Sequence, residues 1–409
     1  MSGTSKLPTP SQTSNAVRDV PGWLIALLAV ASGLTVANLY YAQPLLSSLS
    51  DVFGISTATT GSLITLTQVG YVIGMLFLVP LGDRLEKRKL VTVLLTITTV
   101  ALVVAGLAPN FPVLLVASLI SGATSVVAQI LVPFAANLAP DHARGRVVGR
   151  VMSGLLTGIL LSRTLSSLLS DVTSWRVVFL GSAVLMAVLA VALHFALPQH
   201  APTTSVPYHH VLHSTFQLLR THPMLRRRGL YQAAMFAVFS AFWTTVSFVL
   251  TGPRFHYSAI GVGVFALVGA AGAAVAPLAG HWADRGLARP ATGIALVAAA
   301  LAFAIAGFGG HSIVLLALAA ILVDVAVQTT LILGQHTIYA LDPAARSRLN
   351  SVFIAMFFAG GAIGSQLGTV VYEAAGWSGL TVLGGALPLI ALAYWAFERR
   401  PRQNRNIAG

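Results

Sequence analysis

The chain has 409 residues, of which 56% are hydrophobic and only 9% are charged. About a quarter of the residues of a soluble domain are charged, and such a domain has too little interior to bury so many apolar side chains. The composition therefore excludes a soluble globular protein, a disordered chain and a fibrous repeat. The chain also lacks cysteine, which excludes disulfides, thiolate metal sites and cysteine nucleophiles.

Long apolar segments recur from one end of the chain to the other, each of about the 20 residues that a helix needs to cross roughly 30 Å of hydrocarbon. Their apolar residues run continuously instead of alternating, which is typical of helices and not of β-strands. We therefore predict an all-α membrane protein with twelve transmembrane helices, at residues 22–46, 60–82, 90–108, 111–138, 149–170, 175–197, 228–251, 258–282, 290–309, 312–340, 348–373 and 376–397.

The connecting segments carry Lys and Arg very unevenly. With the N-terminus inside, 21 of the 24 Lys and Arg residues lie on the cytoplasmic side, Arg176 and Arg254 lie outside, and Arg163 lies within a span. The positive-inside rule then places both termini in the cytoplasm, with the chain in the bacterial cytoplasmic (inner) membrane. The net charge of +13 is explained by this topology and by contact with anionic lipid, not by nucleic acid.

The two halves of the chain carry matching loops at an offset near 201 residues. Asp83-Arg84 and Asp284-Arg285 follow the second and eighth spans, and Arg144-Gly145-Arg146 and Arg346-Ser347-Arg348 follow the fourth and tenth. Matching loops on the same side indicate a parallel repeat, hence two pseudo-symmetric six-helix bundles. The predicted segments are a cytoplasmic tail at 1–21, an N-terminal bundle at 22–197, a cytoplasmic linker at 198–227, a C-terminal bundle at 228–397 and a cytoplasmic tail at 398–409.

The linker has two interpretations. Leu212, Phe216 and Leu219 are spaced for one face of a helix, which predicts a short helix on the membrane surface. His209, His210 and His213 are possible metal ligands, but no carboxylate lies near them in the sequence, so we expect no metal there.

At this point the residues resemble the major facilitator superfamily. The segment Leu81–Arg88 is similar to the signature loop between helices 2 and 3 of that family, although Val79 and Glu86 stand where the family usually has glycine. The second copy, Gly280–Gly286, keeps both glycines. The resemblance extends over essentially the whole chain and implies the major facilitator fold, in which helices 1, 4, 7 and 10 line a central cavity, and a monomer.

In finer detail the chain resembles the twelve-helix drug/metabolite:proton antiporter branch, which includes the arabinose-efflux-like permeases. The segments Asn38–Pro44 and Arg346–Asn350 carry this likeness. That branch often has a helix-5 motif associated with export by proton antiport. Here Gly154 and Gly158 remain, but Ile159 replaces the motif's proline and Ser162-Arg163 replace its glycine pair, so the direction of transport stays open.

Away from the ends of the predicted spans, Arg163 and Asp324 are the two charged residues. Placing a charge at the centre of a bilayer costs about 2.5–3.5 kcal/mol on insertion scales, so such residues normally face a cavity or a partner. Removal from water favours the neutral form of a carboxyl group, which makes Asp324 the candidate proton-binding residue, with Arg163 as its partner. Arg163 could instead hold an anionic substrate, and a purely structural ion pair is the alternative.

Polar side chains share faces of several spans, which predicts a solvated cavity, although each stripe alone is also consistent with interhelical hydrogen bonds. Trp243 belongs to an aromatic stripe on the seventh span and is a candidate for an apolar wall. The candidate substrate-cavity residues are Asn38, Tyr40, Tyr41, Gln43, Ser125, Gln129, Trp243, Gln328 and Gln335.

The repeated Asp-Arg loops are the candidate cytoplasmic gate, because the family resemblance implies that such contacts hold the inside closed while the outside is open. The gate candidates are Asp83, Arg84, Arg88, Asp284, Arg285, Arg144, Arg146, Arg346 and Arg348. Glycines four residues apart, such as Gly154 with Gly158 and Gly360 with Gly364, predict close helix packing, either static or along an interface where the two bundles slide.

Together these features predict a secondary active transporter that moves a small organic solute or drug across the cytoplasmic membrane by alternating access, through proton-coupled efflux of the multidrug type. The alternatives are a proton- or solute-coupled uptake permease for an organic anion or a sugar-like metabolite, and a channel or non-transporting receptor. We expect protons and lipid as partners, no nucleic acid, no cofactor and no enzymatic activity, because the sequence lacks a strong nucleotide-binding loop, metal-ligand spacing and a Ser/His/Asp set.

Overall fold

The computed structural model describes residues 21–140, 143–199, 207–342 and 345–398, and its regular elements there are all helices. The N-terminal half contains α1 Gly22–Ala37, η1 Gln43–Leu45, α2 Leu46–Phe53, α3 Thr57–Ile73, η2 Gly74–Leu78, η3 Val79–Asp83, α4 Lys87–Gly106, α5 Phe111–Thr124, α6 Val127–Leu138, α7 Arg144–Val172 and α8 Trp175–Ala196. The linker contains α9 Tyr208–Thr221. The C-terminal half contains α10 Pro223–Thr251, α11 Ala259–Ala266, η4 Leu267–Gly269, α12 Ala270–Ala274, α13 Ala276–Asp284, α14 Ala288–Gly309, α15 Ile313–Tyr339 and α16 Arg346–Ala396.

The described helices confirm the predicted all-α membrane fold. Ten of them, counted with the short elements that continue them, are long and apolar enough to cross a membrane. One of the ten, α16, has 51 residues and is broken at Gly376, whose φ of 64° is accessible to glycine but not to most residues, so its two parts correspond to the last two predicted spans.

The first predicted span, residues 22–46, is not one continuous helix. The helix α1 ends at Ala37, and a turn leads into η1 and α2. Pro44 lies in the first turn of η1, where its missing N–H costs nothing, but a proline within a continuous α-helix would remove a hydrogen bond. The prediction missed this break because the apolar residues continue through it, and hydrophobicity alone does not indicate a turn.

Burial follows the pattern of a protein in lipid. Many of the polar side chains of the spans are buried, including Ser32, Gln68 and Gln232. Large apolar side chains such as Val314, Phe308 and Val382 lie on the outside. Such an outward-facing apolar surface is stable in hydrocarbon and would be a liability in water.

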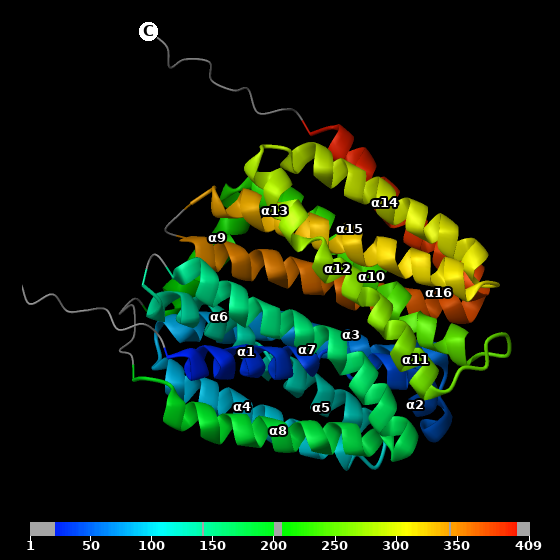
Figure 1. Cartoon of the computed structure of the whole chain (residues 1–409), viewed down its shortest axis with the longest axis horizontal. Helices are drawn as coiled ribbons and strands as arrows, with labels where there is room; N and C mark the ends of the chain where they lie inside the picture. Colours follow the sequence, from blue (N-terminus) through cyan, green and yellow to red (C-terminus); the bar gives the residue numbers. More distant parts are fainter. Residues whose placement is uncertain (1–20, 141–142, 200–206, 343–344, 399–409) are drawn as a thin grey trace, which may run out of the picture.

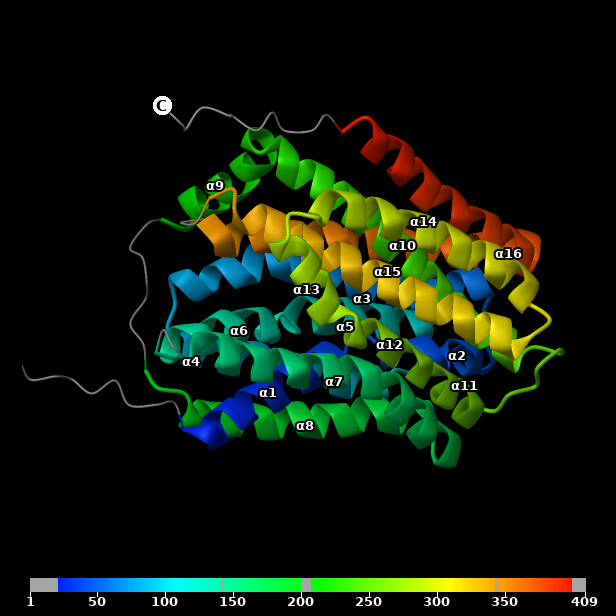
Figure 2. The ribbon, with the colours of Figure 1, turned by 45° about the horizontal axis from the view of Figure 1, so that its top comes forward.

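The helices form two groups that run side by side along the length of the molecule. In both views the N-terminal helices, coloured blue to green, lie together on one side, and the helices α13 to α16, coloured yellow to red, lie on the other (Figures 1 and 2). The main contacts between the groups join α3 to α16 and α7 to α11. The site described below lies between these groups.

Within each half, glycines allow the backbones of neighbouring helices to pack closely. A Cβ atom on Gly158 would lie 2.3 Å from the main-chain oxygen of Gly33 in α1, and one on Gly364 would lie 2.0 Å from that of Ala237 in α10. Gly154 and Gly360 make equally close contacts with α1 and α10. These four glycines therefore provide static packing inside a half, and the hypothesis that they form a sliding surface between the bundles is wrong.

Candidate functional site

The two intramembrane charges lie in the interior of the molecule on opposite halves. Arg163 on α7 is 3% exposed and Asp324 on α15 is 5% exposed. Arg163 donates from Nε to Oε1 of Gln43, 2.8 Å away. Its guanidinium carbon lies 4.5 Å from the centre of the Trp243 ring, 5.0 Å from that of Tyr40 and 5.4 Å from that of Phe239. Aromatic faces stabilise a desolvated cation at such distances.

Asp324 is held by an indole and by a glycine-lined niche. Its Oδ1 accepts a hydrogen bond of 2.9 Å from Nε1 of Trp243. Its other carboxylate oxygen, Oδ2, would lie 2.6 Å from a Cβ atom on Gly269, and the Cβ of Asp324 would lie 2.9 Å from one on Gly272. Larger residues at these two positions of η4 and α12 would therefore displace the carboxylate.

Trp243 lies between the two charges. Its ring contacts Arg163 while its N–H binds Asp324, and no ion pair within 4 Å joins the two charged side chains themselves. Among the described residues, Nη2 of Arg163 and Nε2 of Gln43 are buried without a hydrogen-bond partner. The sequence predicted Trp243 as part of an apolar wall, but in the structure its ring contacts Arg163 and its N–H donates to Asp324. We call Arg163, Trp243 and Asp324 the central triad.

Several predicted cavity residues form hydrogen bonds between helices instead. Asn38 accepts from Ser182 at 2.7 Å and donates to Ser125 at 3.4 Å, so Asn38 and Ser125 tie together α5, α8 and the turn after α1. Tyr41 is buried, and its main-chain oxygen accepts from Ser166. Each of these contacts matches the alternative of interhelical hydrogen bonding.

Two of the predicted cavity residues, Gln129 of α6 and Gln335 of α15, lie at or beside a cavity at one end of the bundle. Gln335 donates to Asn350, 3.1 Å away, and Gln328 is half-buried. Gln129 of α6 donates to the hydroxyl of Tyr71 at 3.2 Å and also lines a cavity.

This cavity has a volume of about 980 Å³ and lies between the two halves. It occupies the end of the molecule where α9 lies, which is on the left in Figure 1, and we call this the basic end. Its charged lining consists of Lys87, Arg144, Arg346 and Arg348 against the single carboxylate of Asp83, together with His210 and His213 of α9. Arg163 and Asp324 are not among the lining residues.

The gate candidates divide into two sets. Asp83, Arg144, Arg346 and Arg348 line the cavity, whereas Arg84, Arg88, Arg146, Asp284 and Arg285 do not. Arg88 instead contacts Nε2 of His194 at 3.2 Å, and Asp284 lies 3.5 Å from His336 at an exposed position. The structure thus brings together matching residues from both repeats around one opening.

The helix α9 lines one side of the cavity and connects the two halves. The hydroxyl of Tyr208 donates to the main-chain oxygen of Phe77 in the N-terminal half, and Arg348 of the C-terminal half donates to Ser214 of α9 at 2.8 Å. Burial raises the pKa of the Tyr208 phenol above its usual value. The predicted linker helix therefore exists, but it contacts both halves. No cluster of three or more metal-ligating residues occurs in the described ranges, His209, His210 and His213 included.

The opposite end of the bundle, which we call the far end, is closed by hydrogen bonds between the halves. The Thr65 and Ser365 hydroxyls lie 2.9 Å apart, Thr251 donates to Ser47 at 3.0 Å, and the Ala58 N–H donates to Glu373 at 2.6 Å. Thr164, the residue after Arg163, donates to the main-chain oxygen of Gly263 at 2.8 Å. The structure therefore combines a closed far end with a cavity at the basic end.

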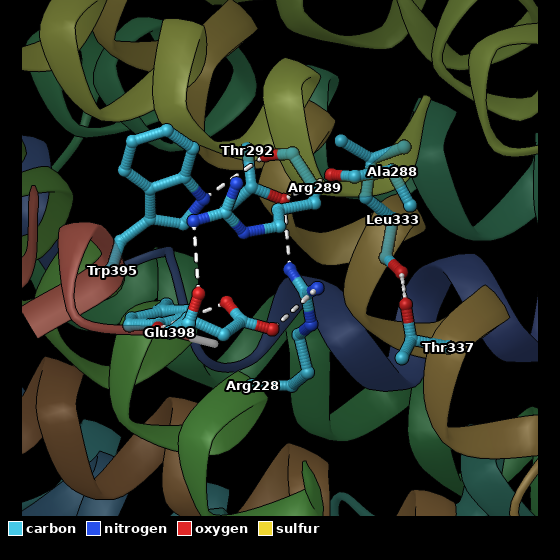
Figure 3. Close-up of polar contacts among 9 residues, drawn as sticks. Arg228, Ala288, Arg289, Thr292, Leu333, Thr337, Trp395 and Glu398 are labelled. Atoms are coloured by element: carbon cyan, nitrogen blue, oxygen red, sulfur yellow. Dashed lines mark hydrogen bonds and ion pairs between the residues drawn. The ribbon is translucent and has the colours of Figure 1, made fainter. Parts of the chain in front are cut away.

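Sequence reasoning missed a buried charged cluster, shown in Figure 3, at the C-terminal end of α16. Arg228 of α10 donates to Thr292 of α14 at 3.0 Å and lies 3.5 Å from the carboxylate of Glu398. The Arg289 side chain donates to the main-chain oxygen of Glu398, and the Arg289 main-chain oxygen accepts from Trp395, both at 3.0 Å. In the sequence, Arg228 and Arg289 only indicated which ends of the spans lie on the cytoplasmic side. A glutamate directly after the last span was the signal that could have indicated an ion pair.

Two helical groups that enclose a cavity, with ten apolar spans among the described residues, form the architecture of a membrane transporter. The sequence model of the Major Facilitator Superfamily matches residues 26–337 and 264–409. The chain belongs to this superfamily, as its sequence resemblance predicted, and it is a multi-pass integral membrane protein that acts as a secondary transporter.

Curated relatives extend over nearly the whole chain. "Uncharacterized transporter YgaY" of Escherichia coli O157:H7 is 39% identical over 383 residues, which cover 93% of this chain and 97% of the relative. "Probable transporter SCO4007" of Streptomyces coelicolor is 34% identical and covers 98% of this chain and 95% of its own length. These relatives support a transporter without giving a substrate.

Solved structures share the fold at low sequence identity. A point mutant of the nucleoside transporter NupG has a TM-score of 0.72 at 17% identity and covers 92% of this chain and 100% of its own. A bacterial homolog to the human lysosomal transporter Spinster, in its inward-facing and unoccupied conformation, has a TM-score of 0.71 at 16% identity, covering 91% and 95%. At these identities the likeness shows the fold alone.

Proposed function

We propose that this protein exports a small organic solute from the cytoplasm in exchange for protons, by alternating access. The observation that carries the proposal is the central triad, in which a carboxyl group buried in the middle of α15 faces an arginine from the other half of the molecule through one aromatic ring. A buried carboxyl without a direct ion-pair partner is a group that can gain and lose a proton during a transport cycle.

Alternating access needs one end of the molecule that can open and another that admits a solute. The far end is held by several hydrogen bonds between side chains, which a rigid-body movement could break without unfolding a helix. The cavity at the basic end gives a solute of several hundred Å³ a place between the halves. With the predicted orientation, the basic end faces the cytoplasm, so a solute enters from inside.

Export is favoured over import by the likeness of Asn38–Pro44 and Arg346–Asn350 to the efflux branch.

The test of the proposed function uses everted membrane vesicles from a host that lacks its own efflux pumps. Respiration acidifies the vesicle interior, an acridine dye reports the proton gradient, and a panel of solutes including Hoechst 33342 and fluorescein is added. Exchange predicts that a transported solute releases protons and restores dye fluorescence.

The decisive variant is Asp324→Asn, which keeps the size of the side chain and removes the titratable group. We expect it to abolish solute-induced proton release while the protein remains folded. Asp171→Asn is the matched control, because Asp171 is exposed near the end of α7. Unchanged proton release by the Asp324→Asn variant would rule out Asp324 as the proton site.

A second candidate is the proton-coupled uptake of an organic anion. It is favoured by the unpartnered Nη2 of Arg163 and by the excess of cationic residues in the cavity lining. An anion bound beside Arg163 would offset its charge and so promote protonation of Asp324, which would make the anion and the proton move together. In right-side-out vesicles, uptake would then show inward proton movement on adding an anion, whereas export would not.

A further inference from the structure

We propose that Trp243 is a positioning residue that makes proton binding at Asp324 depend on whether the far end is open or closed. This inference rests on the proposed proton-coupled function and specifies how that coupling arises. In the closed arrangement the indole holds Asp324 near the charge of Arg163, and this charge moves away when the halves separate.

The contact between Arg163 and Trp243 crosses from one half to the other. Arg163 comes from α7 and is fixed by Gln43 of η1, both in the N-terminal half. Trp243 and Asp324 come from α10 and α15, both in the C-terminal half, and they are joined by a direct hydrogen bond. A movement between the halves therefore changes the first contact and preserves the second.

The indole is held firmly in the C-terminal half. It packs edge-on against Phe242, with ring centres 5.6 Å apart, and lies 6.0 Å from Phe265. A Cβ atom on Gly269 would lie 3.3 Å from the indole and 2.6 Å from Oδ2 of Asp324. Trp243 and Asp324 thus share one niche and move as a unit.

The closing contacts of the far end lie next to this niche. Thr164 follows Arg163 in the chain and donates to Gly263, which belongs to the same predicted span as Gly269. Opening the far end must break this hydrogen bond and withdraw α7, together with Arg163, from Trp243. Because a nearby cation stabilises a carboxylate, its withdrawal favours protonation of Asp324.

This sequence of events couples the proton to the movement of the halves. When the far end is open, Asp324 binds a proton; when it closes, Arg163 returns to the indole and Asp324 releases the proton. The other titratable side chain with an electrostatic interaction with Asp324 is the phenol of Tyr40, from the turn before η1. Within the described residues, Arg163 is therefore the charge that differs between the two arrangements.

The test measures the pH at which Asp324 is half-protonated, by infrared difference spectroscopy of its carboxyl band in the purified protein. The band is assigned by its loss in the Asp324→Asn variant. Trp243→Phe keeps a ring beside Arg163 but removes the N–H donor, so we expect half-protonation about one pH unit higher, a tenfold change in proton affinity. Trp377→Phe is the control, because that indole donates to the main-chain oxygen of Ala306 and packs on the same Phe242.

A second measurement leaves the triad intact. Thr65→Cys with Ser365→Cys, in a chain free of other cysteines, should lock the far end closed when oxidised. We expect half-protonation of Asp324 at a lower pH, by about tenfold in proton affinity, in the oxidised than in the reduced protein. Equal values in the two forms, or equal values for Trp243→Phe and Trp377→Phe, would overturn the inference.

These outcomes separate the inference from the proposed function. If Asp324→Asn abolishes proton-coupled transport while the midpoints stay unchanged, the function stands and the role of Trp243 is wrong. If the midpoints shift as expected while Asp324→Asn transports normally with protons, the switch is real and the proposed function is wrong.

Discussion

Arg144 and Arg346 occupy equivalent positions in the two halves, and each donates from Nε to a main-chain oxygen of the preceding helix. The acceptors are Ala136 at the end of α6 and Tyr339 at the end of α15, both 3.1 Å away. Both arginines also line the cavity. The pseudo-symmetry of the fold therefore extends to the hydrogen bonds that shape the opening at the basic end.

Replacing these arginines should impair turnover more than folding. We expect Arg144→Gln with Arg346→Gln to lower the rate of solute exchange about tenfold or more, because both loops lose their attachment beside the cavity. Thermal stability in detergent should change little, since both side chains are exposed. Arg146→Gln is the control, because Arg146 is exposed and does not line the cavity. Equal transport by the double variant and this control would remove the arginine pair from the gate.

The far end should open during each transport cycle. Ser47→Cys with Thr251→Cys places two thiols where hydroxyls now lie 3.0 Å apart, on opposite halves. We expect an oxidant to stop solute exchange in this variant and a reductant to restore it. Each single cysteine variant, treated with the same oxidant, should keep its activity. Full transport by the cross-linked protein would mean that the halves do not separate at this point.

The sequence predicted the helical spans, the repeat and the two buried charges, because hydrophobic length and loop charge are local properties. It could not predict the hydrogen bond between Trp243 and Asp324, since these residues are 81 positions apart and meet only through the packing of α10 on α15. For the same reason Asn38 looked like a cavity residue, whereas Ser182 and Ser125 satisfy its amide inside one half. The residue type in the sequence indicates that a side chain is polar, but the packing of the helices determines which group it binds by a hydrogen bond.

The Arg228–Glu398 pair is expected to support stability. Removing one partner of a buried ion pair leaves an uncompensated charge, which costs about 3–5 kcal/mol. Glu398→Gln should therefore lower the thermal midpoint of the purified protein by several degrees, as followed by size-exclusion chromatography after heating. Asp284→Asn provides the comparison, because its pair with His336 is exposed and should contribute less than about 1 kcal/mol. Equal midpoints for the two variants would show that the buried cluster adds nothing to stability.

Because α1 and α7 approach each other closely, we predict that stability depends steeply on the size of the residue at position 158. In Gly158→Ala the new methyl group would meet the backbone of Gly33 at 2.3 Å, so the helices must move apart. We expect a loss of about 1–3 kcal/mol in stability, read as a lower thermal midpoint and a smaller monodisperse fraction after purification. Gly149→Ala on the same helix has open space around the added group and should be neutral or slightly stabilising, because alanine favours the helix. If both variants behave alike, the helices have room to spare, and the contact at Gly158 does not set their separation.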